Sequence, residues 1–78
     1  MMAVGFILIT TETGAEVDVR EAVSRIDGVV GQWIIFGLHD LFVKVEAEDE
    51  AELTKCIVKG VRGISGIIET RTLIGAEI

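Results

Sequence analysis

The chain has 78 residues, half of them hydrophobic, and carries a formal net charge of −6. This acidic balance excludes the basic surface that nucleic-acid binding requires, and the single cysteine excludes an internal disulfide framework. A domain of this size has one small core, and the aliphatic content exceeds what such a core can hide. The composition therefore favours association with other chains.

The N-terminal apolar run, residues 1–9, is too short to cross a bilayer and lacks the basic segment of a signal peptide. The chain is expected to be cytoplasmic and to make no membrane contact. It has no proline and no low-complexity linker, so residues 1–78 are expected to form one domain.

The first predicted strand is residues 3–10, AVGFILIT, which is apolar on both faces. A helix follows, with Thr13 as its expected N-cap and Glu16 as the reciprocal partner in a capping box. Gly28 is the expected stop of this helix. Its apolar stripe has helical spacing and consists of Val19, Ala22, Val23 and Ile26.

Residues 29–36 form the second predicted strand, and the four-residue segment 37–40, GLHD, turns it into a third strand at 41–47. Neither strand alternates cleanly between apolar and polar residues, as a strand with one wet face would. A second helix is expected to begin at Asp49, with Glu52 three positions later in a capping box.

The second helix ends at Gly66, and residues 67–74 form the last predicted strand. Gly60 and Gly63 lie within this second helix, and each costs roughly 1 kcal/mol of helix stability relative to alanine. They indicate either a close approach of the backbone to a neighbour or an early end. The predicted buried stripe is Leu53, Cys56, Ile57, Val61 and Ile64.

A short internal sequence repeat supports this order of helices and strands. Residues 26–30, IDGVV, and residues 64–68, ISGII, share one pattern at the two joints between a helix and the following strand. The chain therefore consists of two βαβ-like units, and right-handed crossovers put both helices on the same face of one sheet. The predicted fold is α+β, a ferredoxin-like βαββαβ with a four-stranded antiparallel sheet.

One face of this sheet is left without helices. At roughly 25 cal/mol per Å², leaving several apolar side chains exposed would forfeit several kcal/mol. We therefore expect a second copy to cover this face in a face-to-face dimer. The alternative is a monomer that tolerates an exposed apolar sheet. The predicted dimer interface consists of Phe6, Trp33, Ile34 and Phe42.

The segments 37–49, GLHDLFVKVEAED, and 65–74, SGIIETRTLI, resemble the effector-binding, C-terminal domain of the Lrp/AsnC feast/famine transcriptional regulators. That domain shows Gly-x-x-Asp, an aliphatic strand ending in Lys-Val, a short acidic stretch, a helix and a threonine-containing last strand. The positions that match are Gly28, Val29, Gly37, Asp40, Lys44, Val45, Gly66, Thr70 and Thr72.

The resemblance implies a dimeric α/β barrel-type assembly in which dimers form rings, such as octamers or decamers. It also implies that small effectors, typically amino acids, bind between dimers and act in transcriptional regulation. The chain begins at the first strand of the family's domain, so we expect a stand-alone version without a helix-turn-helix domain. A full-length Lrp/AsnC regulator is a candidate partner.

The ligand-binding residues that the resemblance implies are Gly37, Leu38, His39, Asp40, Thr70 and Thr72. Glycine lets a ligand carboxylate approach backbone N–H groups closely. Asp40 can accept charge-assisted hydrogen bonds from an α-ammonium group, and threonine hydroxyls can donate or accept. No metal and no cofactor are expected.

Each of these residues also has a simpler interpretation. Asp40 is a common turn residue, and ligand contact and turn chemistry are equally compatible with its position. An exposed loop histidine without a role is an alternative for His39. Cys56 is interpreted as a core thiol. The acidic run at residues 46–52 looks like a solvated cap at a helix start rather than a metal site.

Two other functions share the predicted fold. A small dimeric α+β barrel enzyme would need a catalytic set, and His39 is the only histidine, with no evident nucleophile and orienting group. An ACT-like amino-acid-binding module has the same topology. The Gly-x-x-Asp segment favours the Lrp/AsnC domain, so the prediction is a non-enzymatic effector-binding domain.

Overall fold

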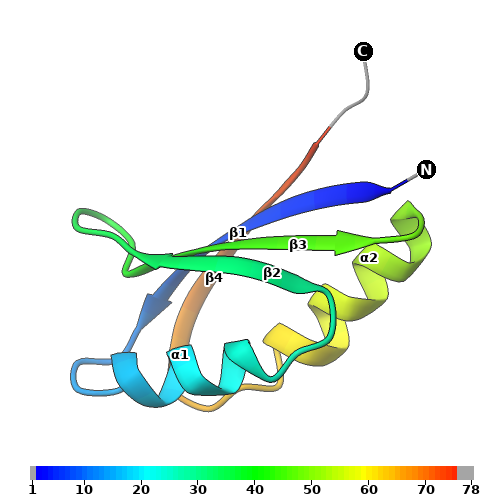
Figure 1. The fold of residues 1–78 in the computed structure, drawn as a ribbon. Helices are drawn as coiled ribbons and strands as arrows, with labels where there is room; N and C mark the ends of the chain where they lie inside the picture. The colour runs from blue at the N-terminus through cyan, green and yellow to red at the C-terminus, as the bar shows by residue number, and fades with distance from the viewer. Residues whose placement is uncertain (1, 76–78) are drawn as a thin grey trace.

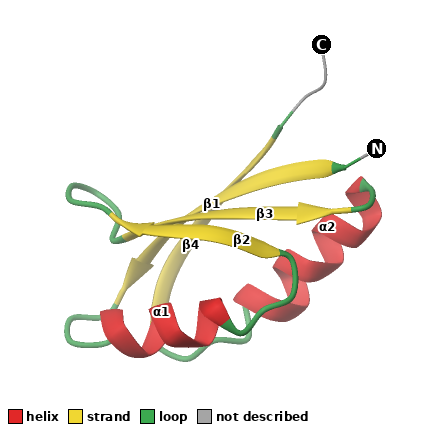
Figure 2. Cartoon of the chain, in the orientation of Figure 1, coloured by secondary structure: helices red, strands yellow, loops and turns green. Residues whose placement is uncertain are grey.

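The computed structural model describes residues 2–75 as one antiparallel sheet with helices on a single face (Figure 1). Figure 2 shows both helices on the same side of the strands. The order of strands in the sheet is β2-β3-β1-β4, which is the predicted ferredoxin-like arrangement. In chain order the elements are β1 (Ala3–Thr11), α1 (Glu16–Ser24), β2 (Val29–Ile34), β3 (Leu41–Ala47), α2 (Glu50–Cys56), the π-helical turn η1 (Ile57–Val61) and β4 (Ile67–Ile74).

The core lies between the helices and the two central strands. Alternate residues of β1 and β3 point toward the helices, because side chains alternate across a strand. Burial of these aliphatic side chains supplies most of the favourable free energy of folding. The buried residues are Ile7, Ile9, Val19, Val23, Leu41, Val43, Val45, Leu53, Ile57 and Val61.

The predicted bounds of β3 and β4 are confirmed, whereas β2 is shorter than predicted. It ends at Ile34 instead of residue 36, because the backbone N–H of Ile35 donates to the Asp40 carbonyl at 3.0 Å and closes a loop. Phe36 consequently stands outside the ladder and is 98% exposed.

The predicted start of α1 is wrong. Thr13 does not cap the helix: the N-cap is Ala15, which makes no side-chain capping bond. The Ala15 amide donates to the Glu12 carbonyl at 2.9 Å and closes a turn with Thr13 and Gly14 at its corner. Gly14 has a φ of +90°, which is not a helical conformation, so the N-cap lies at Ala15, two residues after the predicted one.

The predicted start of α2 is confirmed. Asp49 is extended, and its Oδ1 accepts from the Glu52 amide at 2.8 Å. Beyond Cys56 the helix widens into η1, which contains Gly60. A Cβ added to Gly60 would lie 2.9 Å from Cγ2 of Ile26, so this glycine does permit a close approach of η1 to the turn that follows α1.

The sheet face away from the helices carries a connected aromatic cluster, here called the aromatic face: Phe6, Trp33 and Phe42. The Phe6 and Phe42 rings stack with centroids 5.3 Å apart, and the Trp33 ring lies 5.8 Å from Phe42. Three of the four predicted interface residues thus lie together. Ile34 does not join them: it pairs with Leu41, whose side chain belongs to the core.

The position of Ile34 follows from a register shift between Val29 and Gly31. Val29 pairs with Val45 and packs against the core, whereas Gly31 and Trp33 pair with Lys44 and Phe42 on the other face. A bulge of this kind breaks the simple two-residue alternation. Ile34, 55% exposed, therefore lies on the helix side at the edge of the sheet.

Candidate functional site

The loop between β2 and β3, residues 35–40, contains four of the six predicted ligand-binding residues. Gly37 has a φ of +135°, which L side chains rarely adopt, and a Cβ added there would meet no atom within 4 Å. Glycine is therefore needed here for backbone conformation rather than for packing. Leu38 is 92% exposed beside Phe36, so the loop presents two large apolar side chains to solvent.

Asp40 anchors the base of this loop to the end of β1. Its Oδ2 accepts from the Thr11 amide at 2.8 Å and from the Thr11 hydroxyl at 3.3 Å. Its own amide donates to the Ile9 carbonyl at 2.8 Å. Turn chemistry for Asp40 is therefore observed. Within residues 2–75 the other carboxylate oxygen, Oδ1, has no hydrogen-bond partner and can still receive a donor.

His39 is partly buried rather than a free loop histidine. Its Nδ1 lies 3.0 Å from the Thr10 hydroxyl, which is also 3.4 Å from the Leu38 carbonyl. Which of the two groups donates depends on the histidine tautomer. The loop is thus fastened to β1 at two successive residues, Thr10 and Thr11.

The two threonines of β4 lie on the helix side of the sheet, opposite Ile9 and Ile7. Because Leu41 and Thr70 both pair with Ile9, they are two strand spacings apart, about 10 Å. Thr70 therefore lies at the same end of the sheet as Asp40. Thr72 is two residues further along β4, about 7 Å away from that end, and one chain does not bring it to the loop.

The sequence interpretation missed Thr10 and Thr11. Thr11 is 6% exposed, the one buried polar side chain among the residues that the structure describes. The only signal in the sequence is a threonine pair that ends an apolar strand. Nothing local shows that its partners lie 29 residues further along the chain.

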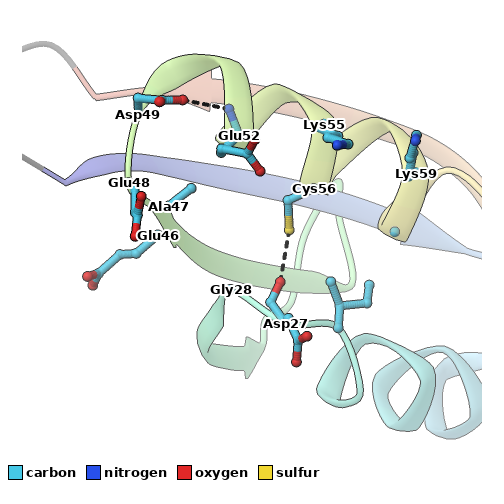
Figure 3. A pocket seen from close by; sticks show the side chains of 12 residues that line it. Asp27, Gly28, Glu46, Ala47, Glu48, Asp49, Glu52, Lys55, Cys56 and Lys59 are labelled. Atoms are coloured by element: carbon cyan, nitrogen blue, oxygen red, sulfur yellow. Dashed lines mark hydrogen bonds between the residues drawn. The ribbon is translucent and has the colours of Figure 1, made fainter.

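A shallow groove of about 740 Å³ lies at the opposite end of the sheet (Figure 3). Its walls come from the turn after α1, the end of β3, the loop that follows β3, α2 and η1. Cys56 points across it, and its thiol donates to the Asp27 carbonyl at 3.0 Å. Cys56 packs against the core but is only partly buried, so the interpretation as a core thiol is only partly right.

Burial raises the pKa of the Cys56 thiol, and the charge of Asp27 raises it further. Asp27→Asn is expected to lower this pKa and to make alkylation by iodoacetamide at pH 8 about two- to threefold faster, because the thiolate is the reactive form. The rates are measured by mass spectrometry. The urea-unfolded proteins serve as the control and should react equally; equal rates in the folded proteins would contradict the assignment.

The raised pKa of the Cys56 thiol also determines the direction in which stability changes with pH. The folded state holds the thiol proton more tightly than the unfolded state. The resulting stabilisation is present below the unfolded-state pKa and is lost as the pH rises through the folded-state pKa.

The acidic run at residues 46–52 does not converge on a common point. Within residues 2–75, no group of three or more His, Cys, Asp or Glu side chains is arranged to hold a metal ion. Glu46 lies 3.8 Å from Lys44, and Asp49 is used as a helix cap. In the same part of the chain, no helix has the length and apolar character needed to cross a membrane.

The fold and the anchored Gly-x-x-Asp loop define a class, the small ferredoxin-like domains with a four-stranded antiparallel sheet. Residues 4–77 match the family model described as the Lrp/AsnC ligand binding domain. The chain belongs to the Lrp/AsnC family, and the resemblance seen in the sequence is confirmed.

Solved structures support this assignment. The crystal structure of FFRP-DM1 is 31% identical, covers 95% of this chain and 99% of its own, and superposes with a TM-score of 0.89. Escherichia coli AsnC is 21% identical with a TM-score of 0.88; it covers 97% of this chain, which spans 52% of AsnC. The transcriptional regulator NMB0573 from Neisseria meningitidis, solved as an L-Met complex, is 14% identical, with a TM-score of 0.78 and coverage of 96% and 50%. The last two show the fold alone. No curated protein sequence matches the chain.

Proposed function

We propose that this domain binds a free amino acid beside the 37–40 loop and assembles with copies of itself, without catalysing a reaction. The observation that carries the proposal is the Asp40 carboxylate, which is held by one oxygen at the base of an exposed loop while its other oxygen has no hydrogen-bond partner within residues 2–75. A fixed carboxylate of this kind suits an α-ammonium group. The family assignment supports an effector-binding role.

The other parts of an amino acid find matching groups nearby. Gly37 leaves its backbone open to a ligand carboxylate, because no side chain stands in front of it. Leu38 offers an apolar wall, and a neighbouring dimer supplies the rest of the enclosure. Thr70 and Thr72 complete the proposed site, with Thr72 contributed from a second copy. The L-Met complex of NMB0573, a regulator of the same fold, supports a free amino acid as ligand class.

The aromatic face is the proposed dimer contact. Three aromatic side chains on one uncovered sheet face form the apolar centre that stable interfaces have. Dimers then associate into a ring such as an octamer or decamer, and the 37–40 loop lies where dimers meet.

The domain is proposed to act in the cytoplasm, in transcriptional regulation, by joining a full-length Lrp/AsnC regulator. Its net charge of −6 opposes direct contact with DNA, so the partner provides DNA recognition. On this proposal residues 1–78 work as one domain.

A panel of the twenty amino acids in a thermal-shift assay tests the binding claim, because a ligand of the folded state raises the Tm. We expect at least one of them to raise the Tm at millimolar concentration. Asp40→Asn is expected to remove most of that shift, since a neutral amide loses the charge-assisted bond. Asp27→Asn, at the groove, is the matched control and should keep it. If no amino acid raised the Tm, or if both variants lost the Tm shift equally, the proposal would be contradicted.

The arrangement around His39 supports the non-enzymatic proposal over the enzyme alternative. The Thr10 hydroxyl and the His39 ring lie at 3.0 Å, as a nucleophile and a base would. Within residues 2–75 no carboxylate hydrogen-bonds to His39, because the Asp40 carboxylate binds Thr11 instead. In this part of the chain the histidine ring is hydrogen-bonded only to the threonine that it would have to activate.

A further inference from the structure

We propose that Thr11 is a positioning residue of the effector site, one that orients the Asp40 carboxylate so that Oδ1 is presented to a ligand ammonium group. This inference rests on the proposed function and adds a residue from outside the Gly-x-x-Asp segment. At the end of β1, a buried threonine meets the only carboxylate of the 35–40 loop.

Two donors of one residue converge on one oxygen. The Thr11 amide lies 2.8 Å and the Thr11 hydroxyl 3.3 Å from Asp40 Oδ2. Rotation of the carboxylate about its Cβ–Cγ bond would break both bonds together. Hydrogen bonds to a charged acceptor are about twice as strong as neutral ones. The direction of Oδ1 is therefore determined by Thr11, without any contact between Thr11 and the ligand.

The environment of Thr11 makes this orientation costly to lose. At 6% exposure its hydroxyl has little access to water that could replace the carboxylate. A rotated Asp40 would leave a buried hydroxyl and a backbone N–H without partners, which is more unfavourable than losing a bond at the surface. The free oxygen of Asp40 is thus held ready before any ligand arrives.

The backbone around Thr11 shows how its amide becomes available. The pairing of β1 with β3 ends at Ile9 and Leu41, and the Thr11 amide donates to a carboxylate where a strand carbonyl would otherwise stand. On the other side, the register between β1 and β4 shifts between Thr10 and Thr11, which leaves Ile68 as the extra residue. Bulges of this kind commonly redirect groups next to functional sites.

Thr10 provides an internal comparison. It holds the same loop through hydrogen bonds to His39 and the Leu38 carbonyl, whereas the hydrogen bonds of the Asp40 side chain go to Thr11. If Thr11 merely stiffened the loop, removing either hydroxyl would have a similar effect. If Thr11 orients Asp40, its hydroxyl matters more.

The test uses isothermal titration calorimetry with the amino acid that gives the largest Tm shift in the panel of twenty. Thr11→Val keeps the size of the side chain and loses the hydroxyl; it is expected to weaken binding about tenfold. Thr11→Ser restores the hydroxyl and should bind within about twofold of the unchanged chain, and Thr10→Val should weaken binding no more than about threefold. Equal losses in Thr10→Val and Thr11→Val, or no rescue by serine, would overturn the assignment.

A measurement without ligand separates this inference from the proposed function. Hydrogen exchange at the Thr11 amide should become about tenfold faster or more in Asp40→Ala, because the acceptor of that amide is gone. Unchanged exchange would refute the contact itself, whatever the panel shows. Fast exchange together with a panel that gives no Tm shift would leave the Thr11–Asp40 geometry correct and the amino-acid proposal wrong.

Discussion

Replacing Phe42 with glutamate is expected to convert the proposed assembly of face-to-face dimers into monomers of 8.4 kDa. Phe42 is the centre of the aromatic face, stacked on Phe6 at 5.3 Å and beside Trp33 at 5.8 Å. In a face-to-face dimer the substitution would bury two carboxylates without partners, at a cost of several kcal/mol each. The dissociation constant of the dimer should therefore rise by about a thousandfold or more, since each 1.4 kcal/mol is tenfold.

Size-exclusion chromatography with light scattering gives the mass directly. Val58→Glu is the matched control, because Val58 is an exposed apolar residue of η1 on the helix side, and the charge change is the same. This variant should keep the mass of the unchanged protein. An unchanged mass for Phe42→Glu, or a monomeric parent protein, would refute the dimer proposal and with it the location of the site between dimers.

Replacing Gly28 with alanine is expected to reduce the free energy of unfolding by about 3 kcal/mol, from two separate causes. Gly28 has a φ of +98°, and an L side chain in that conformation costs about 1–2 kcal/mol. An added Cβ would also lie 3.0 Å from the Glu46 carbonyl oxygen and 3.2 Å from the Cys56 sulfur. Crowding in a packed interior adds about 1–3 kcal/mol. Such a loss is a large part of the stability of a small domain.

Gly14 isolates the first cause from the second. Its φ is +90°, and a Cβ added there meets no atom within 4 Å. Gly14→Ala should therefore cost only the backbone term, about 1–2 kcal/mol. Urea unfolding followed by circular dichroism measures both variants. Equal losses would show that the contact of Gly28 with the end of β3 and with α2 contributes nothing.

The two ends of the sheet differ in what they offer a ligand. Several carboxylates line the groove end, but two of them are already engaged: Asp49 caps α2, and Glu46 is paired with Lys44. The loop end has the carboxylate of Asp40, of which one oxygen is hydrogen-bonded and the other has no partner among the residues that the structure describes. A comparison of Asp40→Asn with Asp27→Asn therefore tests whether the chain binds an amino acid and also at which end of the sheet it binds.

Much of the fold was accessible from the sequence, because it depends on short-range patterns. The bounds of β3 and β4 follow from apolar runs that end at polar or glycine residues. The N-cap at Asp49 follows from a side-chain oxygen placed three residues before Glu52, whose amide has no partner within the helix. The same is true of Gly60, whose place inside a helix signalled a close neighbour. The family resemblance rests on the same kind of local information.

Tertiary structure decided the rest. Because of the bulge at Val30, Trp33 lies on the open face of the sheet and Ile34 lies on the helix side. Alternation along the strand does not by itself show which of the two residues faces the core. The partners of Thr10 and Thr11 lie 29 residues away, and only the pairing of β1 with β3 brings them together. Local sequence determined which segments became strands and helices; long-range packing determined which side chains meet, because contacts between distant residues depend on register and not on neighbours in the chain.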